Sequence, residues 1–182
     1  WAELGELERQ VRDYEAAFGY SAKSGPRHSP DCFDPPRDPE VGRLLAEGYL
    51  RLARQPSYRA QPARYLRGAE DVLGQVVKLD ASDAASWRAL ERLRARRGDR
   101  QGSIVALDQL VRLEPERAAE HYMRMAEYAH AAFREDAAIA YAERAALVAP
   151  EDPAVHEWLG DVYRARRDDA RQGPVRAARG AH

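Results

Sequence analysis

The sequence predicts an all-α protein built from consecutive antiparallel helix pairs. Along nearly the whole chain, apolar residues recur with the 3.6-residue period of an α-helix. Val, Ile and aromatic residues do not alternate with polar residues over the length of a strand. Leu79, Leu113 and Leu147 lie 34 residues apart, and this spacing indicates a repeat. Because one short helix pair cannot bury its own apolar face, we expect neighbouring pairs to stack.

The expected helices follow from where the apolar stripes begin and end. Residues 1–18 carry the first stripe, which stops at Gly19, and residues 41–52 carry the second. Asp83 and Asp152 stand just before helical runs, where a carboxylate accepts hydrogen bonds from free backbone N–H groups. Glycine and proline separate the remaining helices, which are expected at about 63–79, 83–97, 101–113, 117–131, 135–148 and 153–167.

The repeat units share residue types at fixed spacing. A large residue is followed three positions later by Leu or Met, then by a small residue, and Pro closes the unit. The matching positions are Leu45, Ala46 and Tyr49; Trp87, Leu90, Gly98 and Pro115; Tyr122, Met125, Ala126, Ala138, Ala145 and Pro150; and Leu159, Gly160 and Tyr163. This pattern resembles the tetratricopeptide repeat (TPR) family, in a degenerate form of bacterial type, over residues 39–167.

The resemblance implies a right-handed α-solenoid whose first helices line a concave face and whose second helices form the convex face. Two positions depart from the pattern, because Glu91 stands where the family has a small residue and Arg94 where it has tyrosine. We therefore expect looser packing there, or charged groups that reach water along their apolar stems.

The resemblance also divides the chain. Repeat units are expected over about 39–83, 84–118, 119–152 and 153–167. Residues 1–38 are expected to hold the second helix of an incomplete unit and a long proline-rich loop, and residues 168–182 a cap or a disordered tail. Since the sequence starts at Trp1 with an incomplete unit, we expect a piece of a longer repeat protein.

Composition narrows the classes of function. The chain has 29 Lys+Arg and 30 Asp+Glu, a net charge of -1, which argues against a nucleic-acid binder. Its basic residues are almost all arginine, a bias typical of a GC-rich genome. No apolar run is long enough for a membrane span, and no signal peptide is evident, so a cytoplasmic protein is expected.

Six arginines fall between positions 88 and 100, and three of them suggest a binding surface. Arg88, Arg92 and Arg96 follow one another at i, i+4 and i+8 and so share one stripe of a helix. In the family these positions face the groove, where guanidinium groups would pair with carboxylates of a bound segment. The same resemblance assigns further groove positions to Arg43, Glu47 and Arg51, and to Met123, Glu127, His130, Glu157, Asp161 and Arg164. The alternative is a solvated face that binds only water.

The loop over residues 19–39 contains the residues that invite a chemical role. His28 and Cys32 supply two metal ligands, too few for a tetrahedral zinc site, and no catalytic motif surrounds them. We expect a packed or mobile loop, with Tyr20 and Phe33 contacting the helices. No phosphate loop, nucleophile elbow or metalloprotease motif is present, so neither catalysis, a metal nor a cofactor is expected.

These observations favour a protein-interaction scaffold or adaptor that holds a partner peptide or helix, with acidic character, in the concave groove. The alternative is a regulatory or sensor TPR domain that belongs to a larger, possibly catalytic, multidomain protein. A third hypothesis, nucleic-acid binding, predicts a steep dependence of affinity on salt. The sequence does not fix the oligomeric state.

Overall fold

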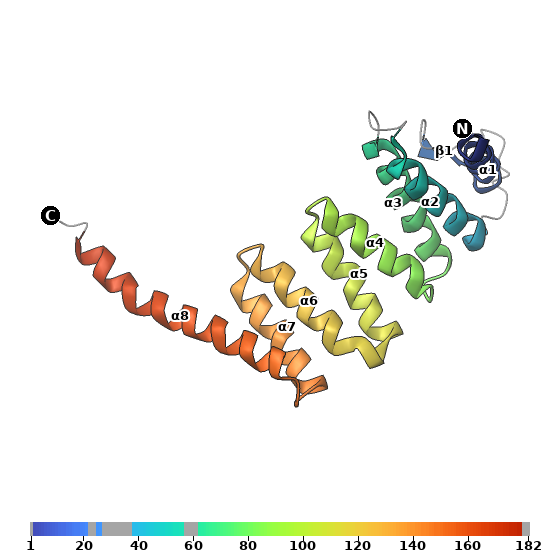
Figure 1. Cartoon of the computed structure of the whole chain (residues 1–182). Helices are drawn as coiled ribbons and strands as arrows, with labels where there is room; N and C mark the ends of the chain where they lie inside the picture. Colours follow the sequence, from blue (N-terminus) through green and yellow to red (C-terminus); the bar gives the residue numbers. More distant parts are fainter. Residues whose placement is uncertain (1, 22–24, 27–37, 57–61, 180–182) are drawn as a thin grey trace. The chain divides into compact units, whose positions relative to one another are not determined.

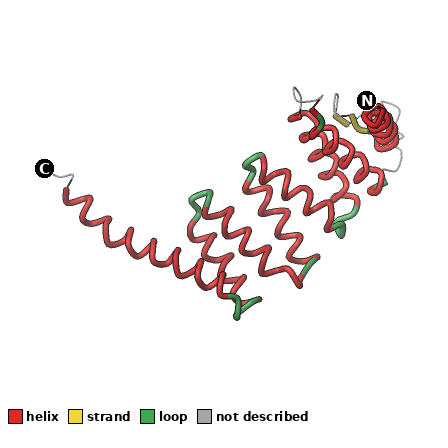
Figure 2. The backbone as a smooth tube through the Cα atoms, in the orientation of Figure 1, coloured by secondary structure: helices red, strands yellow, loops and turns green. Residues whose placement is uncertain are grey.

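The computed structural model describes residues 2–21, 25–26, 38–56 and 62–179, with side chains as far as residue 167. It consists of helices joined by short turns (Figures 1 and 2). The helices are α1 (Ala2–Phe18), α2 (Pro39–Arg54), α3 (Pro62–Leu79), α4 (Ala84–Arg96), α5 (Arg100–Leu113), α6 (Ala118–His130), α7 (Glu135–Val148) and α8 (Pro153–Arg179). The predicted all-α class and its antiparallel helix pairs are confirmed.

Two short elements interrupt the helices. Two-residue strands, β1 (Tyr20–Ser21) and β2 (Gly25–Pro26), pair antiparallel after α1. A 3₁₀ turn, η2 (Pro115–Arg117), precedes α6. The chain forms two compact units, unit 1 over Trp1–Ala106 and unit 2 over Leu107–His182, and each is described by itself.

In unit 1, α2 and α3 form the central pair, with α1 against α2 and α4 against α3. Phe18, Leu45 and Tyr49 are fully buried in its core. Glycine allows α2 to approach its neighbours closely, because a Cβ on Gly42 would lie 2.7 Å from the Phe18 ring and one on Gly48 would lie 2.6 Å from Val11. The interface between these helices therefore depends on backbone contact as well as on apolar side chains.

Polar caps mark the helix starts as the sequence predicts. Asp83 accepts a hydrogen bond from the backbone N–H of Ser86 at 3.2 Å and one from its hydroxyl at 2.6 Å. Asp152 accepts one from the N–H of Ala154 at 2.9 Å. Both predicted caps are thus confirmed, and each satisfies donors that a helix start leaves unpaired.

In unit 2, α6 and α7 form the central pair and α8 packs against α7. Alanines fill much of this interface, which lets the helices lie close together; the fully buried ones include Ala126, Ala138, Ala142 and Ala145. His121 is 1% exposed, and its Nε2 lies 3.1 Å from Glu114 Oε2. Its burial and its contact with Glu114 indicate a structural role for this histidine.

The C-terminal helix is longer than the apolar periodicity. The stripe fades near residue 167, yet the α8 backbone stays helical through Gly173 and Pro174 as far as Arg179. Its alanines and arginines are strong helix formers, which favours continuation. In the last turn of α7, Leu147 is 83% exposed, although Leu79 and Leu113 stand at the same position of the repeat.

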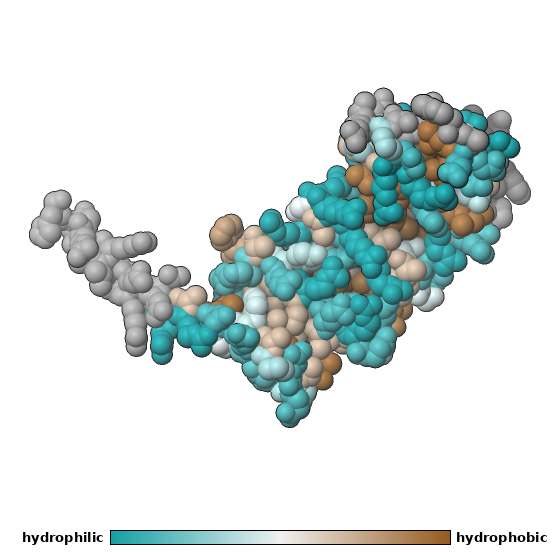
Figure 3. All heavy atoms as spheres, in the orientation of Figure 1, coloured by the Kyte–Doolittle hydropathy of each residue, from teal (hydrophilic) through white to brown (hydrophobic). Residues whose placement is uncertain are grey.

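The turn between α6 and α7 carries hydrophobic atoms at the molecular surface (Figure 3). Phe133 stands in this turn with φ 57°, a left-handed conformation that favours glycine. Its side chain is 92% exposed, the largest value among the exposed large hydrophobic residues of the described chain.

Candidate functional site

The three arginines predicted to face a groove lie in one line on α4. We call Arg88, Arg92 and Arg96 the arginine stripe. Arg92 and Arg96 are exposed, whereas Arg88 is half-buried and its Nε donates a hydrogen bond to the Ala84 carbonyl at 3.3 Å. Within the described chain neither Arg92 nor Arg96 has an ion-pair partner. Their charge is therefore directed to solvent.

A parallel set of side chains lies on α2. Arg43, Glu47 and Arg51 are exposed at the same i, i+4 and i+8 spacing. Arg43 Nη1 lies 3.4 Å from Oδ2 of Asp83, the residue that caps α4. This contact ties the beginning of the α2 set to the beginning of α4. The two sets together hold five arginines against one glutamate, so positive charge dominates.

Unit 2 presents the remaining predicted groove positions on α6 and α8. Met123 is half-buried, and the others, Glu127, His130, Glu157, Asp161 and Arg164, are exposed. The rings of His130 and Trp158 meet edge to face with centroids 6.0 Å apart, which joins α6 to α8. His130 also pairs with Glu135 at 2.9 Å, and Arg164 pairs with Asp161. Glu127 and Glu157 have no described ion pair, so the net charge of this set is opposite to that of unit 1.

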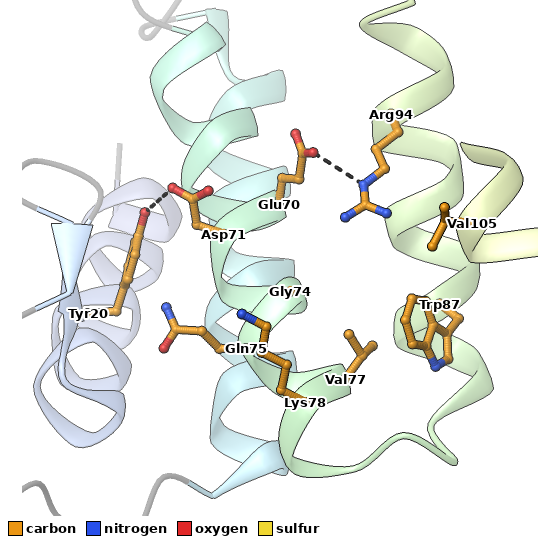
Figure 4. A pocket seen from close by; sticks show the side chains of 10 residues that line it. All are labelled: Tyr20, Glu70, Asp71, Gly74, Gln75, Val77, Lys78, Trp87, Arg94 and Val105. Atoms are coloured by element: carbon orange, nitrogen blue, oxygen red, sulfur yellow. Dashed lines mark hydrogen bonds and ion pairs between the residues drawn. The ribbon is translucent and has the colours of Figure 1, made fainter. Parts of the chain in front are cut away.

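Unit 1 also contains a cavity of about 580 Å³ that the sequence analysis did not predict (Figure 4). We call it the Trp87 pocket. It crosses the middle of α3 at Gly74, with Tyr20 of β1 on one side and Trp87, Arg94 and Val105 on the other. A Cβ on Gly74 would meet no heavy atom within 4 Å, so the missing side chain leaves open space.

The walls of the Trp87 pocket are apolar in the middle and charged at the rim. Val77, Trp87 and Val105 supply the apolar wall. The Trp87 indole N–H donates to the Ala81 carbonyl at 3.0 Å, so the ring has no unsatisfied donor to present to a ligand. Lys78 is exposed at the rim and has no ion pair within the described residues. The pocket therefore offers an apolar surface next to one available cation.

Hydrogen bonds fix the other charged groups of the rim. Arg94 Nε donates to Glu70 Oε1 at 3.4 Å, and Glu70 also pairs with Arg97. On the far side the Tyr20 hydroxyl donates to Asp71 Oδ2 at 2.8 Å. Burial, and then this carboxylate, raise the pKa of Tyr20 above its usual value. The hydroxyl therefore stays protonated at neutral pH and keeps its donor role.

One of the two departures from the repeat pattern, Arg94, lines this pocket. Arg94, which stands at a tyrosine position, extends along α5 and donates from Nη1 to the Gly102 carbonyl at 3.1 Å. Glu91, at a small-residue position, is 1% exposed, and the Ser103 hydroxyl donates to its backbone carbonyl at 3.4 Å. The charged group of Arg94 is thus held by Glu70 and the Gly102 carbonyl, and its side chain is 22% exposed. The packing around the buried Glu91 is close, not loose.

The sequence singled out some of these residues for other reasons. Tyr20 was expected to contact the helices, and it is 3% exposed with its ring 6.2 Å from that of Tyr49. Trp87 was expected in the helix stack, and it does pack against the unit 1 core. Gly74 carried no signal except its place inside an amphipathic helix. The expectations for His28, Cys32 and Phe33 concern residues outside the described part of the chain.

The described residues were also compared with the requirements of a metal site and of a membrane-spanning helix. No three His, Cys, Asp or Glu side chains among them come together as a metal site would require. Likewise, none of the described helices combines the length and the apolar character that crossing a membrane needs.

Solved structures with a similar fold include MamA, with a TM-score of 0.55 and 19% identity over 94% of this chain and 86% of MamA. A second structure, MamA MSR-1 C2, has a TM-score of 0.52 and 16% identity over 95% and 84% of the two chains. TTC0263, a thermophilic TPR protein in Thermus thermophilus, has a TM-score of 0.48 and 22% identity over 89% and 75%. No protein-family model and no curated protein matches the chain.

These similarities define a class. The MamA structures match nearly all of this chain, and the chain has a TPR-like fold of tandem helix pairs. At these identities the likeness concerns the fold alone, because this scaffold carries many unrelated functions.

Proposed function

We propose that this chain is a non-enzymatic protein-interaction module, a degenerate member of the TPR family, that holds an acidic segment of a partner protein. The observation that carries the proposal is the arginine stripe. Arg92 and Arg96 lie exposed on α4, and no carboxylate of the described chain pairs with them. A planar guanidinium binds a carboxylate through two parallel hydrogen bonds, so three of them in line suit a segment with spaced acidic residues.

The α2 set supports the same partner chemistry. Arg43 and Arg51 add positive charge to the exposed surface of α2 in unit 1, with Glu47 between them. Arg43 forms an ion pair with Asp83, so Arg51 is the more available of the two for a carboxylate of the partner. A face with this excess of cations attracts an acidic segment and repels a basic one, which gives specificity as well as a faster encounter.

Unit 2 supplies a second set of contacts of different chemistry. Met123 offers a flexible apolar side chain, and Glu127 and Glu157 offer carboxylates. His130, Asp161 and Arg164 already engage charged neighbours, so they would have to exchange partners when a ligand binds. We therefore assign the main contribution to affinity to the arginine stripe, and selectivity to the unit 2 positions.

The test is capture of partners from a native lysate by the tagged chain, followed by identification of the bound proteins. Changing Arg88, Arg92 and Arg96 together to glutamate should abolish capture, while the helical circular dichroism and the melting temperature change little. Capture that survives this reversal would show that the stripe is only a solvated face.

A matched control separates local binding from overall charge. Arg12, Arg67 and Arg100 are also exposed in unit 1 but lie on α1, α3 and α5. Reversing these three to glutamate changes the net charge by the same amount and should leave capture intact. Equal loss in both triple variants would mean that binding is unspecific electrostatic attraction. A catalytic domain encoded in the same reading frame would instead support the alternative of a regulatory domain.

A further inference from the structure

The turn between α6 and α7 contains a phenylalanine in a left-handed backbone conformation that residues with a side chain rarely adopt. The Arg134 N–H donates to the Ala129 carbonyl at 2.9 Å, and this bond closes the helix end around Phe133. The corresponding bond after α4 runs from the Asp99 N–H to the Arg94 carbonyl at 2.9 Å, and there the left-handed residue is Gly98. The same turn thus has glycine in one place and phenylalanine in the other.

Folding of the described chain gives no reason for this phenylalanine. Phe133 has φ 57° and is 92% exposed, so its ring is held away from the core of unit 2. Arg134 follows it, and two carboxylates come next. Glu135 pairs with His130, and Asp136, which is 88% exposed, pairs with Arg166. A protruding aromatic ring with charges beside it has the character of an interface anchor. We call Phe133 with these two carboxylates the Phe133 turn.

The Trp87 pocket offers an apolar surface to the ring of this turn, and it offers the carboxylates one cation, Lys78, that is unpaired within the described residues. Its volume of about 580 Å³ lies in the range of sites that enclose a ligand group. Open space above Gly74, beside the indole of Trp87, would receive an aromatic ring. Lys78 at the rim has no ion pair in the described chain. It would meet Glu135 or Asp136 after that carboxylate exchanges its present partner, His130 or Arg166.

We propose that the Trp87 pocket of one copy of this chain binds the Phe133 turn of a second copy. The apolar ring enters the space at Gly74 against Trp87, and Glu135 or Asp136 pairs with Lys78. The contact is heterologous, because the two copies contribute different surfaces, so each copy can bind one neighbour at each site. This association goes beyond the proposed function, since it uses neither the arginine stripe nor the α2 set.

The experiment is sedimentation velocity of the whole chain from about 1 μM to about 1 mM, the range in which weak association constants are measured. The wild type should show a mass that grows with concentration. Phe133→Ser removes the ring, and Gly74→Gln fills the open space with a helix-forming side chain. Each should weaken association by about 30-fold or more, as expected for loss of an interface anchor.

Matched controls distinguish this contact from general stickiness. Leu147 is also in unit 2 and is 83% exposed, so Leu147→Ser removes a similar apolar surface and should not alter association. Gly74→Ala adds one methyl group and should leave most of the space free. Circular dichroism of each variant verifies that it folds.

A mixture of the two deficient variants is the decisive measurement. The Phe133→Ser chain keeps its pocket and the Gly74→Gln chain keeps its turn, so an equimolar mixture should form a one-to-one dimer although each alone stays monomeric. A mixture that stays monomeric overturns the proposal, as does a Gly74→Gln variant that assembles like the wild type. A wild type that is monomeric throughout also overturns it, and leaves a segment of another protein as the occupant of the pocket.

Discussion

Replacing Phe133 with glycine is expected to stabilise the fold. The left-handed conformation costs an L-residue about 1–2 kcal/mol, and Phe133 bears this cost at φ 57°. Glycine removes that strain but loses about 0.5–1 kcal/mol through its greater freedom in the unfolded chain. Because the ring is 92% exposed, little burial is lost. The net gain in the free energy of unfolding is therefore about 0–1.5 kcal/mol, or up to about 6 °C in melting temperature for a chain of this size.

The assay is urea unfolding followed by circular dichroism, at a protein concentration low enough that self-association contributes nothing. The reciprocal variant Gly98→Phe should lose a similar net amount, about 0–1.5 kcal/mol, because the same strain is introduced where φ is 76° while the freedom of glycine in the unfolded chain is removed. A Phe133→Gly variant that is less stable than the wild type by more than about 1 kcal/mol would refute the reasoning. It would mean that the ring is packed in the folded monomer and is not free to bind another copy.

Three further predictions concern unit 1. Gly42→Ala should cost about 1–3 kcal/mol in urea unfolding, because its methyl group would lie 2.7 Å from the Phe18 ring; a neutral result would show that α2 shifts easily. Asp83→Ala should cost about 1–2 kcal/mol, because the bonds to Ser86 are lost, whereas an unchanged midpoint would contradict the capping role. Because the pKa of Tyr20 is raised in the folded protein, its neutral hydroxyl contributes fully to the free energy of unfolding below pH 10.0, where the tyrosine of the unfolded chain begins to ionise. This contribution declines as the pH rises above 10.0. Tyr20→Phe should flatten this alkaline decline, and an equally steep curve would assign it to other groups.

Much of the fold could be predicted because its boundaries are marked locally. The predicted helix over 135–148 is α7 (Glu135–Val148), and the one over 63–79 is α3 (Pro62–Leu79) with one more residue. Capping carboxylates, glycine and proline act within a turn of their own position, so a sequence shows them directly. The burial of a side chain depends on contacts with distant parts of the chain, so local patterns predict it less well. Leu79 and Leu147 recur in register with Leu113, yet they are 51% and 83% exposed, so the repeat marks position in a unit but not contact.

The two candidate surfaces differ in how far a sequence could reveal them. The arginine stripe depends only on the helical period, and its three positions do lie in line on α4. The Trp87 pocket depends on β1, α3, α4 and α5 meeting around an absent side chain at Gly74, which no local pattern encodes. One clue was present, because Arg94 breaks the repeat pattern and became part of the pocket wall. Positions that depart from the pattern of a family can therefore mark a site.

The two proposals are separable because they use different sides of one helix. At about 100° per residue, the middle of the arginine stripe lies roughly 150° around α4 from Trp87 and Arg94. A side chain changed on one side therefore does not reach a ligand on the other. The triple reversal of the stripe should abolish partner capture without affecting self-association, and Gly74→Gln should do the opposite. If both properties fell together in either variant, α4 itself would be disturbed, and the circular dichroism of that variant would show it.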